Sequence, residues 1–562
     1  MFHETFTQEK NPLNSGKTQK PKQKKDEVCM SLVRGDWFYI VLMLLDGFFM
    51  TRPYLYAIQN DNYRISEIFK NKRLRRVYLA DVCVVLAYFA LWLLFYLLNS
   101  KAFWGFLVAL FFFITEFAMY FMEDLPDRKK PLKYTKRAVR CLSFVTVLAA
   151  AIGSVSLALA TYRFADDYLR YLVFFAYALI FPFVFIVGGS IINVFERLNN
   201  RRYEMKTAKI LQKRTDLIKI AITGSYGKTS VKNFLNAILS QKYNVLSTPE
   251  SYNTPMGIAK SVKMLDQTHE VFIAEFGARR VGDIKRLMKI VKPQYSILTG
   301  INVQHLETFK TFDNIKREKC RILDVGDGAC VINADVRDIA ENYVARIPQI
   351  PETIYAGLDE NADIFASNVS VSTEGSEFDI VVGDDVYRAR TKILGIHNVQ
   401  NIMLAVCMAI KLGVEMPYIL NAIDNLQPVA HRQQLIEGNG VTIIDDSFNS
   451  NPDGAKCALK TLALFDKRKV VVTPGFVELG KREEGENYNL GKSIAEVCDV
   501  VLLIGARRTE SIRRALKDAN YYGTVIVYDS LKRCQNDFKN VLRLDDVVLL
   551  LNDLPDIYDD KM

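Results

Sequence analysis

Long apolar runs in the first 200 residues constrain the fold of this 562-residue chain more than any other feature. A helix needs about 20 apolar residues to cross the hydrocarbon core of a bilayer. Such a segment must satisfy its backbone polar groups internally, which favours helices. Three runs are long enough and a fourth follows them: Val77–Leu98, Phe103–Met122, Cys141–Thr161 and Leu169–Val194. The sequence therefore predicts an N-terminal α-helical membrane domain over residues 1–200, with about four transmembrane helices and a basic tail.

An earlier run, Trp37–Met50, is shorter, carries Asp46 and ends at Arg52-Pro53. Its length leaves a weak fifth span and a re-entrant or surface helix both open. Segments rich in Lys and Arg stay in the cytoplasm. Four spans place every basic flank inside, whereas a fifth would move the lysine-rich N-terminus out. We therefore expect that Trp37–Met50 does not cross, and that the chain is a multi-pass protein of the cell membrane in contact with the lipid bilayer.

Charge and cysteine usage narrow the class of protein further. The net charge is +10, but the basic residues concentrate beside the apolar runs, so membrane-flanking charge explains them better than a nucleic-acid partner. Nine scattered cysteines without a CxxC pair argue against a disulfide framework and a zinc site. Asp81 and Glu116 lie within or near apolar runs, where carboxylates are functional candidates unless they sit at the interface or pair with a neighbouring helix.

Residues 220–230 read IAITGSYGKTS and predict a phosphate-binding loop. A buried-strand pattern (Leu217–Ile222) precedes the loop and a helical pattern (Val231–Leu239) follows it, which is the context that such a loop requires. Gly224 and Gly227 let backbone N–H groups turn toward an anion, Lys228 faces the β- and γ-phosphates, and the Thr229 hydroxyl holds Mg²⁺. The remaining residues of the loop are Ser225, Tyr226 and Ser230. Ile222 stands where the commoner spacing has glycine, so this is a shorter variant.

Eight further motifs follow in order, and together they identify a family. They are SYNTPMG (Ser251–Gly257), AEFGARRVGDI (Ala274–Ile284), TGINVQHLETF (Thr299–Phe309), IKREKCRIL (Ile315–Leu323), GIHNVQN (Gly395–Asn401), HRQQL (His431–Leu435), DDSFNSNPDG (Asp445–Gly454) and TPGFVELG (Thr473–Gly480). From Lys219 to its C-terminus the chain resembles the Mur ligases, ATP-dependent amide-forming enzymes of cell-wall peptidoglycan synthesis. It looks closest to the MurF type, which adds D-alanyl-D-alanine.

The resemblance implies an α/β fold after the membrane domain. We expect a central P-loop ATPase-like domain over residues 201–425, with a β-rich portion near 354–393, and a smaller Rossmann-like α/β domain over residues 426–562. Strand and helix patterns alternate in the last part, as such a domain requires. Arg432 and Asp446 then lie on a different domain from Lys228, so domain closure completes the site, with the catalytic domains in the cytoplasm.

Family chemistry assigns roles at the phosphate end of the site. A substrate carboxylate takes the γ-phosphate of ATP, and an amine then displaces phosphate from the acyl phosphate. The resemblance makes Glu275 a Mg²⁺ ligand beside Thr229, and makes His305 a ligand of a second Mg²⁺. Lys319 matches a lysine that many members carry as a carbamate, which turns a cation into an anion able to support the metal. MurF-type enzymes commonly have an acidic residue two positions on, where this chain has Arg321.

The other matching residues belong to the nucleotide and the substrates. His397, Asn398 and Asn401 match the adenine-side motif, with Asn401 the best candidate to bind the base. Arg432 would contact phosphate, as the planar guanidinium suits, and Asp446 would contact the ribose. Asn253, Asn449 and Asn451 are the candidates for substrate binding.

The chain departs from the family in three places. Membrane spans stand where soluble MurF-type ligases have a domain that binds the UDP-sugar peptide. Gly300 and Asn302 reverse the usual Asn/Gly order, and the chain ends LNDLPDIYDDKM in place of a lysine-glycine-serine phosphate contact. We therefore expect a UDP-linked or lipid-linked cell-wall precursor and an amino acid or dipeptide as substrates.

Three alternatives stay open from sequence. The chain could add amino acids to a capsule or other surface polymer. It could be a membrane-bound ATPase that drives or regulates transport, although it has no LSGGQ-like signature and that function would leave Glu275, His305 and Lys319 without a role. It could also be an inactive ligase that serves as a scaffold in a complex of cell-envelope enzymes, although the intact P-loop argues against this.

Overall fold

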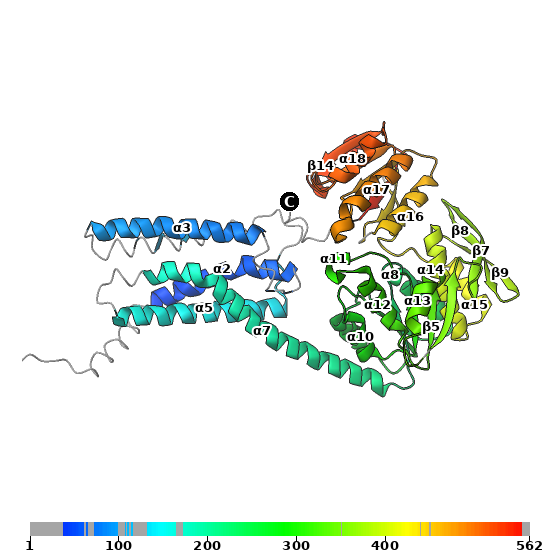
Figure 1. The fold of residues 1–562 in the computed structure, drawn as a ribbon, viewed down its shortest axis with the longest axis horizontal. Helices are drawn as coiled ribbons and strands as arrows, with labels where there is room; N and C mark the ends of the chain where they lie inside the picture. The colour runs from blue at the N-terminus through cyan, green and yellow to red at the C-terminus, as the bar shows by residue number, and fades with distance from the viewer. Residues whose placement is uncertain are drawn as a thin grey trace, which may run out of the picture. The chain divides into compact units, whose positions relative to one another are not determined.

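The computed structural model describes residues 37–60, 63, 65, 72–98, 107, 110–111, 114–115, 118, 132–163, 172–349, 351–438, 440–448 and 451–552. The chain divides into two compact units. The first comprises Met1–Leu198 with Asp556–Met562, and the second comprises Asn199–Pro555. Each unit is described by itself below (Figure 1).

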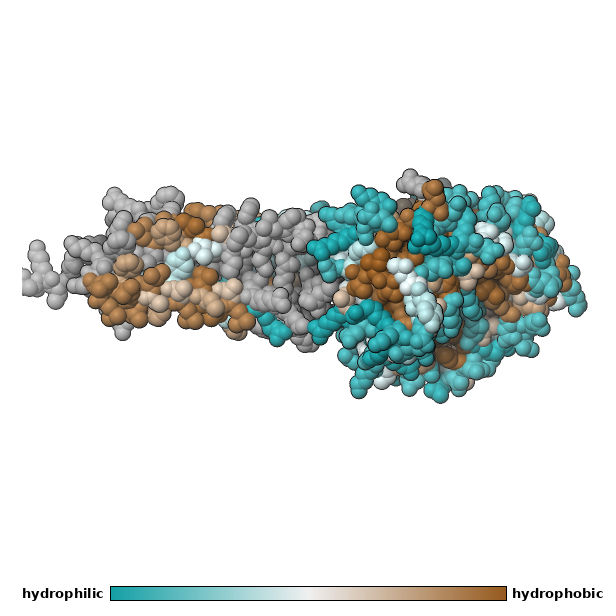
Figure 2. Space-filling view, turned by 90° about the horizontal axis from the view of Figure 1, so that it is seen from above, coloured by the Kyte–Doolittle hydropathy of each residue, from teal (hydrophilic) through white to brown (hydrophobic). Residues whose placement is uncertain are grey.

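Long apolar helices make up the described part of the first unit. They are α2 (Trp37–Asn60), α3 (Lys72–Leu97), α5 (Lys136–Arg163) and α7 (Leu172–Lys213), of which α7 continues into the second unit. Tyr54, Phe181 and Phe185 pack in their core, yet many large apolar side chains point outward: Leu79, Leu86, Val147, Leu159 and Phe195 are each more than half exposed. Figure 2 shows this hydrophobic surface in brown, against the mostly hydrophilic surface of the α/β unit.

Four described helices are long and apolar enough to cross a membrane by length and composition: they contain the segments Val41–Gln59, Tyr78–Phe95, Lys136–Ala160 and Phe175–Lys213. We expected the Trp37–Met50 run not to cross, but the helix that contains it is longer than the run and supplies the first of these four candidate segments. Helix α2 continues through Pro53 to Asn60, because a proline can stay inside a helix when packing against other helices compensates for its missing N–H. The predicted span Phe103–Met122 lies outside the described residues except for six positions, and so does Glu116.

A nine-stranded sheet forms the centre of the second unit, in the order β2-β3-β1-β4-β5-β6-β7-β8-β9. Strands β2 to β7 are parallel and β7 to β9 are antiparallel. The strands are β1 (Ile218–Thr223), β2 (Val245–Ser247), β3 (Val271–Glu275), β4 (Tyr295–Leu298), β5 (Ala329–Asn333), β6 (Glu352–Gly357), β7 (Ile364–Ser372), β8 (Gly375–Val382) and β9 (Asp385–Thr391). The helices are α8 (Lys228–Leu239), α9 (Pro255–Val262), α10 (Asp283–Val291), α11 (Leu306–Phe309), α12 (Phe312–Cys320), α13 (Arg337–Val344), α14 (Ile396–Lys411) and α15 (Met416–Asp424).

Alternating side chains of the parallel strands build two cores, one on each face of this sheet. Ile220 and Ile222 of β1 pack with α8 and α14, whereas Ala221 packs with α10 and with Ile315 of α12. Helix α14 is buried on nearly all sides, and its sequence is accordingly apolar all round. Burial on both faces explains why the strands read as continuous apolar runs.

The topology of the sheet determines where a ligand can bind. The connection after β1 leads to β2 on one side of it, whereas the connection after β3 leads to β4 on the other side of β1. Ligands of open parallel sheets bind at such a switch point, beyond the carboxyl ends of the strands. The register pairs Ile222 with Glu275 of β3 and Thr223 with Leu298 of β4. The loops that follow β1, β3 and β4 therefore meet at one edge.

A six-stranded sheet forms the C-terminal part, in the order β10-β11-β15-β12-β13-β14. All neighbours are parallel except the hairpin β10-β11. The strands are β10 (Gln434–Gly438), β11 (Val441–Asp446), β12 (Lys469–Thr473), β13 (Val500–Ile504), β14 (Thr524–Tyr528) and β15 (Val547–Leu551), and the helices are α16 (Pro452–Ala463), α17 (Glu483–Val497), α18 (Glu510–Asp518) and α19 (Leu531–Val541).

Candidate active site

The loop after β1 forms a tight backbone turn that ends at the N-terminus of α8. Gly227 is the N-cap residue with φ of 75°, a conformation that glycine adopts without strain. A Cβ at Gly227 would also collide with Oδ1 of Asn401 from α14. The Lys228 ammonium donates to the carbonyl of Gly224 at 2.7 Å, and burial lowers its pKa to about 8. The loop thus gathers a helix N-terminus and one lysine, which together suit a phosphate group.

Glu275 collects polar partners from three elements at the end of β3. Its side chain accepts hydrogen bonds from the Thr229 hydroxyl at 3.0 Å and from the Asn253 amide at 3.0 Å. Lys232 of α8 lies 3.6 Å away, and both charged side chains are 1% exposed. Asn253, predicted to bind substrate, is thus placed on this carboxylate. A buried carboxylate beside a hydroxyl is a donor set of hard oxygens that fits Mg²⁺.

Lys319 lies buried at the end of α12, among groups of both charges. Burial, reinforced by the positive charge of Lys228, lowers the pKa of Lys319 well below its ordinary value, while Glu318, Asp283 and Glu275 oppose this shift. The neighbouring Glu318 is engaged elsewhere, because it accepts from the Ile284 amide at 2.8 Å and pairs with Arg321 at 3.1 Å. Arg321, the departure from the family pattern, therefore balances the charge of Glu318.

His305 follows β4 and meets the C-terminal part of the unit. Its Nδ1 lies 2.5 Å from Oε2 of Glu478, and burial lowers the pKa of the imidazole although this hydrogen bond raises it. The charge of Lys319 also lowers the His305 pKa, which places the two side chains near each other. His305, Lys319, Glu275 and Lys228 thus belong to one electrostatic cluster.

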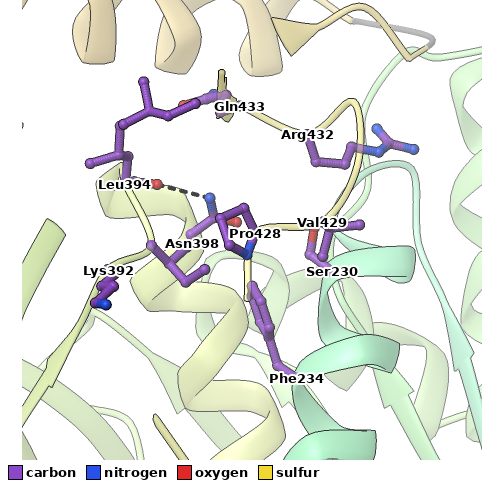
Figure 3. A pocket seen from close by; sticks show the side chains of 11 residues that line it. Ser230, Phe234, Lys392, Leu394, Asn398, Pro428, Val429, Arg432 and Gln433 are labelled. Carbon is purple, nitrogen blue, oxygen red and sulfur yellow. Dashed lines mark hydrogen bonds between the residues drawn. The ribbon is translucent and has the colours of Figure 1, made fainter. Parts of the chain in front are cut away.

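A pocket lies next to α8, between α14 and the segment that leads into β10 (Figure 3). Its lining combines apolar side chains with an amide and a guanidinium: Ser230, Phe234, Lys392, Ile393, Leu394, Asn398, Pro428, Val429, Arg432, Gln433 and Leu435. Asn398 donates to the Leu394 carbonyl at 2.8 Å, which fixes its amide at the wall of the pocket. An apolar wall with few polar groups is typical of a site for a flat organic ring.

Two residues predicted to bind the base lie outside this lining. Asn401 donates to Asn398 Oδ1 at 3.4 Å. Its own Oδ1 is the atom that a Cβ at Gly227 would meet first, so Asn401 packs against the loop after β1. His397 has a ring nitrogen, Nδ1, that is buried without a hydrogen-bond partner among the described residues, and burial lowers its pKa to about 4. His397 is therefore neutral near pH 7.

Arg432 and Asp446 approach from the C-terminal part. The charge of Arg432 acts on Asp446, but burial dominates and raises the Asp446 pKa to about 7. The Arg432 guanidinium stacks over the Phe448 ring at 4.5 Å from its centroid. Asn302 donates to Asn451 Oδ1 at 2.8 Å, so Asn451 sits at the contact between the two sheets' loops. Asn449 lies outside the described residues.

The reversed Asn/Gly order at positions 300 and 302 has a physical explanation in Tyr226. A Cβ at Gly300 would lie 2.8 Å from Cε1 of the Tyr226 ring and closer still to its Cζ. With the Tyr226 ring in this position, glycine is the residue at 300 that fits without a shift. Asn302, two residues after Gly300, contacts the same loop: its backbone N–H donates to Ser225 Oγ at 3.0 Å.

We expect Gly300→Ala to reduce nucleotide affinity, because the added methyl group pushes Tyr226 and the loop backbone apart. Overpacking of this kind costs about 1–3 kcal/mol. The double variant Gly300→Ala/Tyr226→Ser should recover most of the affinity, measured by calorimetric titration with a non-hydrolysable ATP analogue. Tyr226→Ser alone is the control, and a double variant as weak as Gly300→Ala would contradict the explanation.

Comparison with known proteins agrees with this geometry. The Mur ligase middle domain matches residues 222–409, and the Mur ligase glutamate ligase domain matches residues 431–552, together more than half of the chain. The chain belongs to the Mur ligase family. Members of this family are ATP-dependent ligases that form amide bonds, and the first match covers the phosphate loop, Glu275, His305 and Lys319.

Individual relatives place this Mur ligase near the MurF type. It is 29% identical over 335 residues to the UDP-N-acetylmuramoyl-tripeptide–D-alanyl-D-alanine ligase of Buchnera aphidicola, a match that covers 58% of this chain and 72% of that enzyme. The Escherichia coli enzyme of the same name is 28% identical, over 51% of this chain and 64% of its own length, less than two thirds. A crystal structure of MurF from Acinetobacter baumannii aligns with a TM-score of 0.56 at 25% identity, over 64% of this chain and 79% of that one.

Two side chains of this Mur ligase site were not assigned a role from sequence. Lys232 reads as an ordinary helical lysine, and only its position one turn after Lys228, on the same face of α8, could have pointed to the site. Glu478 lies inside the quoted motif TPGFVELG, but its partner His305 is 173 residues away in the sequence. Long-range contacts of this kind are not visible in local patterns.

Proposed function

We propose that this Mur ligase is a membrane-anchored, MurF-type enzyme that couples D-alanyl-D-alanine, or a similar amine, to a muramoyl peptide. The observation that carries the proposal is the cluster of Lys228, Thr229, Glu275, His305 and Lys319 at the switch point of a parallel sheet. The relatives of this name support the choice of substrates.

The reaction requires two displacements. An oxygen of the substrate carboxylate attacks the γ-phosphorus of ATP and ADP leaves, which gives an acyl phosphate. The amine then attacks the acyl carbon, inorganic phosphate leaves, and the nitrogen loses a proton. Both steps build negative charge on oxygen, so fixed cations and backbone donors stabilise them. Lys228, the first N–H groups of α8 and Arg432 supply these groups in this chain.

Mg²⁺ supplies further positive charge at the phosphate oxygens when it is bound. Thr229 and Glu275 would hold one ion, while His305 and a carbamylated Lys319 would hold a second. The depressed pKa of Lys319 supports the modification, because only the neutral amine reacts with CO₂, releasing one proton. Glu275 pairs with Lys232 in the structure, so a cation already balances this carboxylate in the absence of metal.

The remaining residues are proposed to bind the nucleotide and the substrates. The pocket of Figure 3 would take the adenine, with Phe234, Leu435 and Asn398 in its lining. Asp446 would bind the ribose, and Asn451 would face the amine or the acyl acceptor. Asn253 acts on Glu275 and so serves the metal more directly than the substrate.

Membrane anchoring is supported by the outward apolar surface of the N-terminal helices. Only 17% of the segment Tyr78–Phe95 is buried within the structure, so the rest of its apolar surface needs another nonpolar environment. A lipid bilayer provides that environment. A ligase held at the membrane would meet precursors at the bilayer surface, so we propose that its acceptor is lipid-linked or is handed over there.

The acceptor can be identified directly. We expect full-length enzyme in lipid nanodiscs to ligate D-alanyl-D-alanine to a lipid-linked muramoyl tripeptide at least about 10-fold faster at low substrate than to the UDP-linked form, since anchoring raises the effective concentration. ATP-dependent product formation is measured by mass spectrometry, with each acceptor alone and each amine alone as controls. Equal rates with both acceptors would remove the case for a lipid-linked acceptor. Product only with other amino acids and a non-muramoyl glycan would favour a surface-polymer ligase.

A further inference from the structure

One segment, residues 299–309, touches both the phosphate loop and the C-terminal part; we refer to it as the bridging segment. On one side, the Ser225 N–H donates to the Gly300 carbonyl at 2.8 Å. On the other side, Asn302 donates to Asn451 and also to Asp453 Oδ2 at 3.1 Å. The segment follows β4 directly, next to β1 in the sheet, so movement of the C-terminal part would act first on this segment.

The contact between His305 and Glu478 is the most specific part of this bridge. His305 Nδ1 and Glu478 Oε2 are 2.5 Å apart, and the Glu307 N–H donates to the Glu478 carbonyl at 3.3 Å. Both His305 and Glu478 have left-handed backbone conformations, with φ of 61° and 66°. Non-glycine residues pay about 1–3 kcal/mol for strained backbone of this kind, which persists where the surroundings impose it and concentrates at functional sites.

We propose that Glu478 is a positioning residue that holds His305 ready to bind the second metal ion only when the C-terminal part is closed onto the sheet. The inference rests on the proposed function, because it takes His305 as a metal ligand.

The chemistry of the pair explains the effect. A carboxylate accepts the Nδ1 proton, so the imidazole keeps its lone pair on Nε2, the nitrogen that remains free to bind a metal. Carboxylates that accept from a metal-binding histidine fix the orientation of the ring and raise its basicity. Glu478 comes from the segment between β12 and α17, whereas His305 follows β4, so this support exists only when the two parts are together.

Coupling of this kind acts in both directions. If closure strengthens metal binding at His305 by a given factor, metal binding must favour closure by the same factor. Lys319, whose charge acts on His305, lies on α12 of the central part. The central part would therefore provide His305 and Lys319 for the second metal site, and the C-terminal part would provide Glu478, which orients His305.

The test measures metal binding and closure, without turnover. Full-length enzyme is titrated with Mn²⁺ in the presence of a non-hydrolysable ATP analogue, and bound Mn²⁺ is counted by electron paramagnetic resonance. We expect Glu478→Ala to weaken the second Mn²⁺ by about 10–100-fold, the usual effect of removing such a supporting carboxylate. The first Mn²⁺, at Thr229 and Glu275, should bind as in the wild type. Glu478→Gln, which keeps the shape and an acceptor oxygen, should show a smaller loss.

Closure is followed in the same titration by energy transfer between dyes on the two parts. Glu478→Ala should need correspondingly more Mn²⁺ to close, and the matched control Glu484→Ala, which removes an exposed carboxylate paired with Arg514 on the same C-terminal part, should match the wild type. Wild-type curves for both Glu478 variants would overturn the inference while leaving the proposed function intact. If the wild type bound neither the analogue nor a first Mn²⁺, the proposed function itself would be wrong.

Discussion

Lys228→Ala is expected to lower ATP-dependent ligation by about 10³-fold or more, because the lysine is the cation nearest the γ-phosphate in the proposed site and loss of one preorganised charge contact costs at least this much in comparable sites. Lys228 already lies on the carbonyls of Gly224 and Ser225, where the loop turns toward an anion. The assay is release of phosphate that depends on both the acid and the amine substrate.

The control for this prediction is Lys285→Ala, which removes an exposed lysine from α10 of the same central sheet. It should leave the rate unchanged. Thermal unfolding of both variants should match the wild type within a few degrees, which separates a lost contact from a lost fold. Phosphate release from Lys228→Ala at the wild-type rate would rule out a catalytic role for Lys228, whereas a wild type that releases no phosphate would favour a scaffold.

Lys232→Met is expected to destabilise the enzyme by about 3–5 kcal/mol in the absence of divalent metal, because it leaves the buried Glu275 carboxylate without its ion-pair partner. Met has a similar length and fills the space of the lysine chain. Added Mg²⁺ should restore part of the lost stability, since the ion replaces the missing positive charge beside Glu275. The measurement is chemical unfolding of the α/β unit in full-length protein, with EDTA and with Mg²⁺.

Lys260→Met is the matched substitution on the surface, at an exposed position of α9. Its stability should not respond to Mg²⁺ differently from the wild type. If Lys232→Met were as stable as Lys260→Met in EDTA, the pair of Lys232 and Glu275 would not carry the charge balance described for this site.

The parallel strands of the α/β unit could be predicted from sequence because both of their faces are buried. The predicted strand Leu217–Ile222 lies within one residue of β1, and the predicted helix Val231–Leu239 ends where α8 ends. The antiparallel strand β10 was not predicted, since its residues 436–438 are exposed and lack an apolar run. The continuation of α2 beyond Pro53 was missed because packing within a helical bundle overrides a local helix breaker.

In the candidate site, too, local motifs could be predicted from sequence, whereas contacts between distant residues could not. Lys228 and Glu275 could be proposed from sequence because each lies in a motif at the end of a strand or in the loop that follows it. Contacts between residues that are distant in the sequence could not be predicted. The closeness of Asn401 Oδ1 to Gly227 and the contact of Glu478 with His305 could not be predicted from sequence. Sequence spacing contains no information on such partners until the sheets are in place.

The close fit of Tyr226 over Gly300 also bears on how this enzyme's loop could have evolved. Glycine at 300 accommodates either a small residue or an aromatic ring at 226, whereas any larger residue at 300 excludes the ring. A larger residue at 300 would need the Tyr226 ring to move or to be replaced. We therefore expect the residues at 226 and 300 to change together.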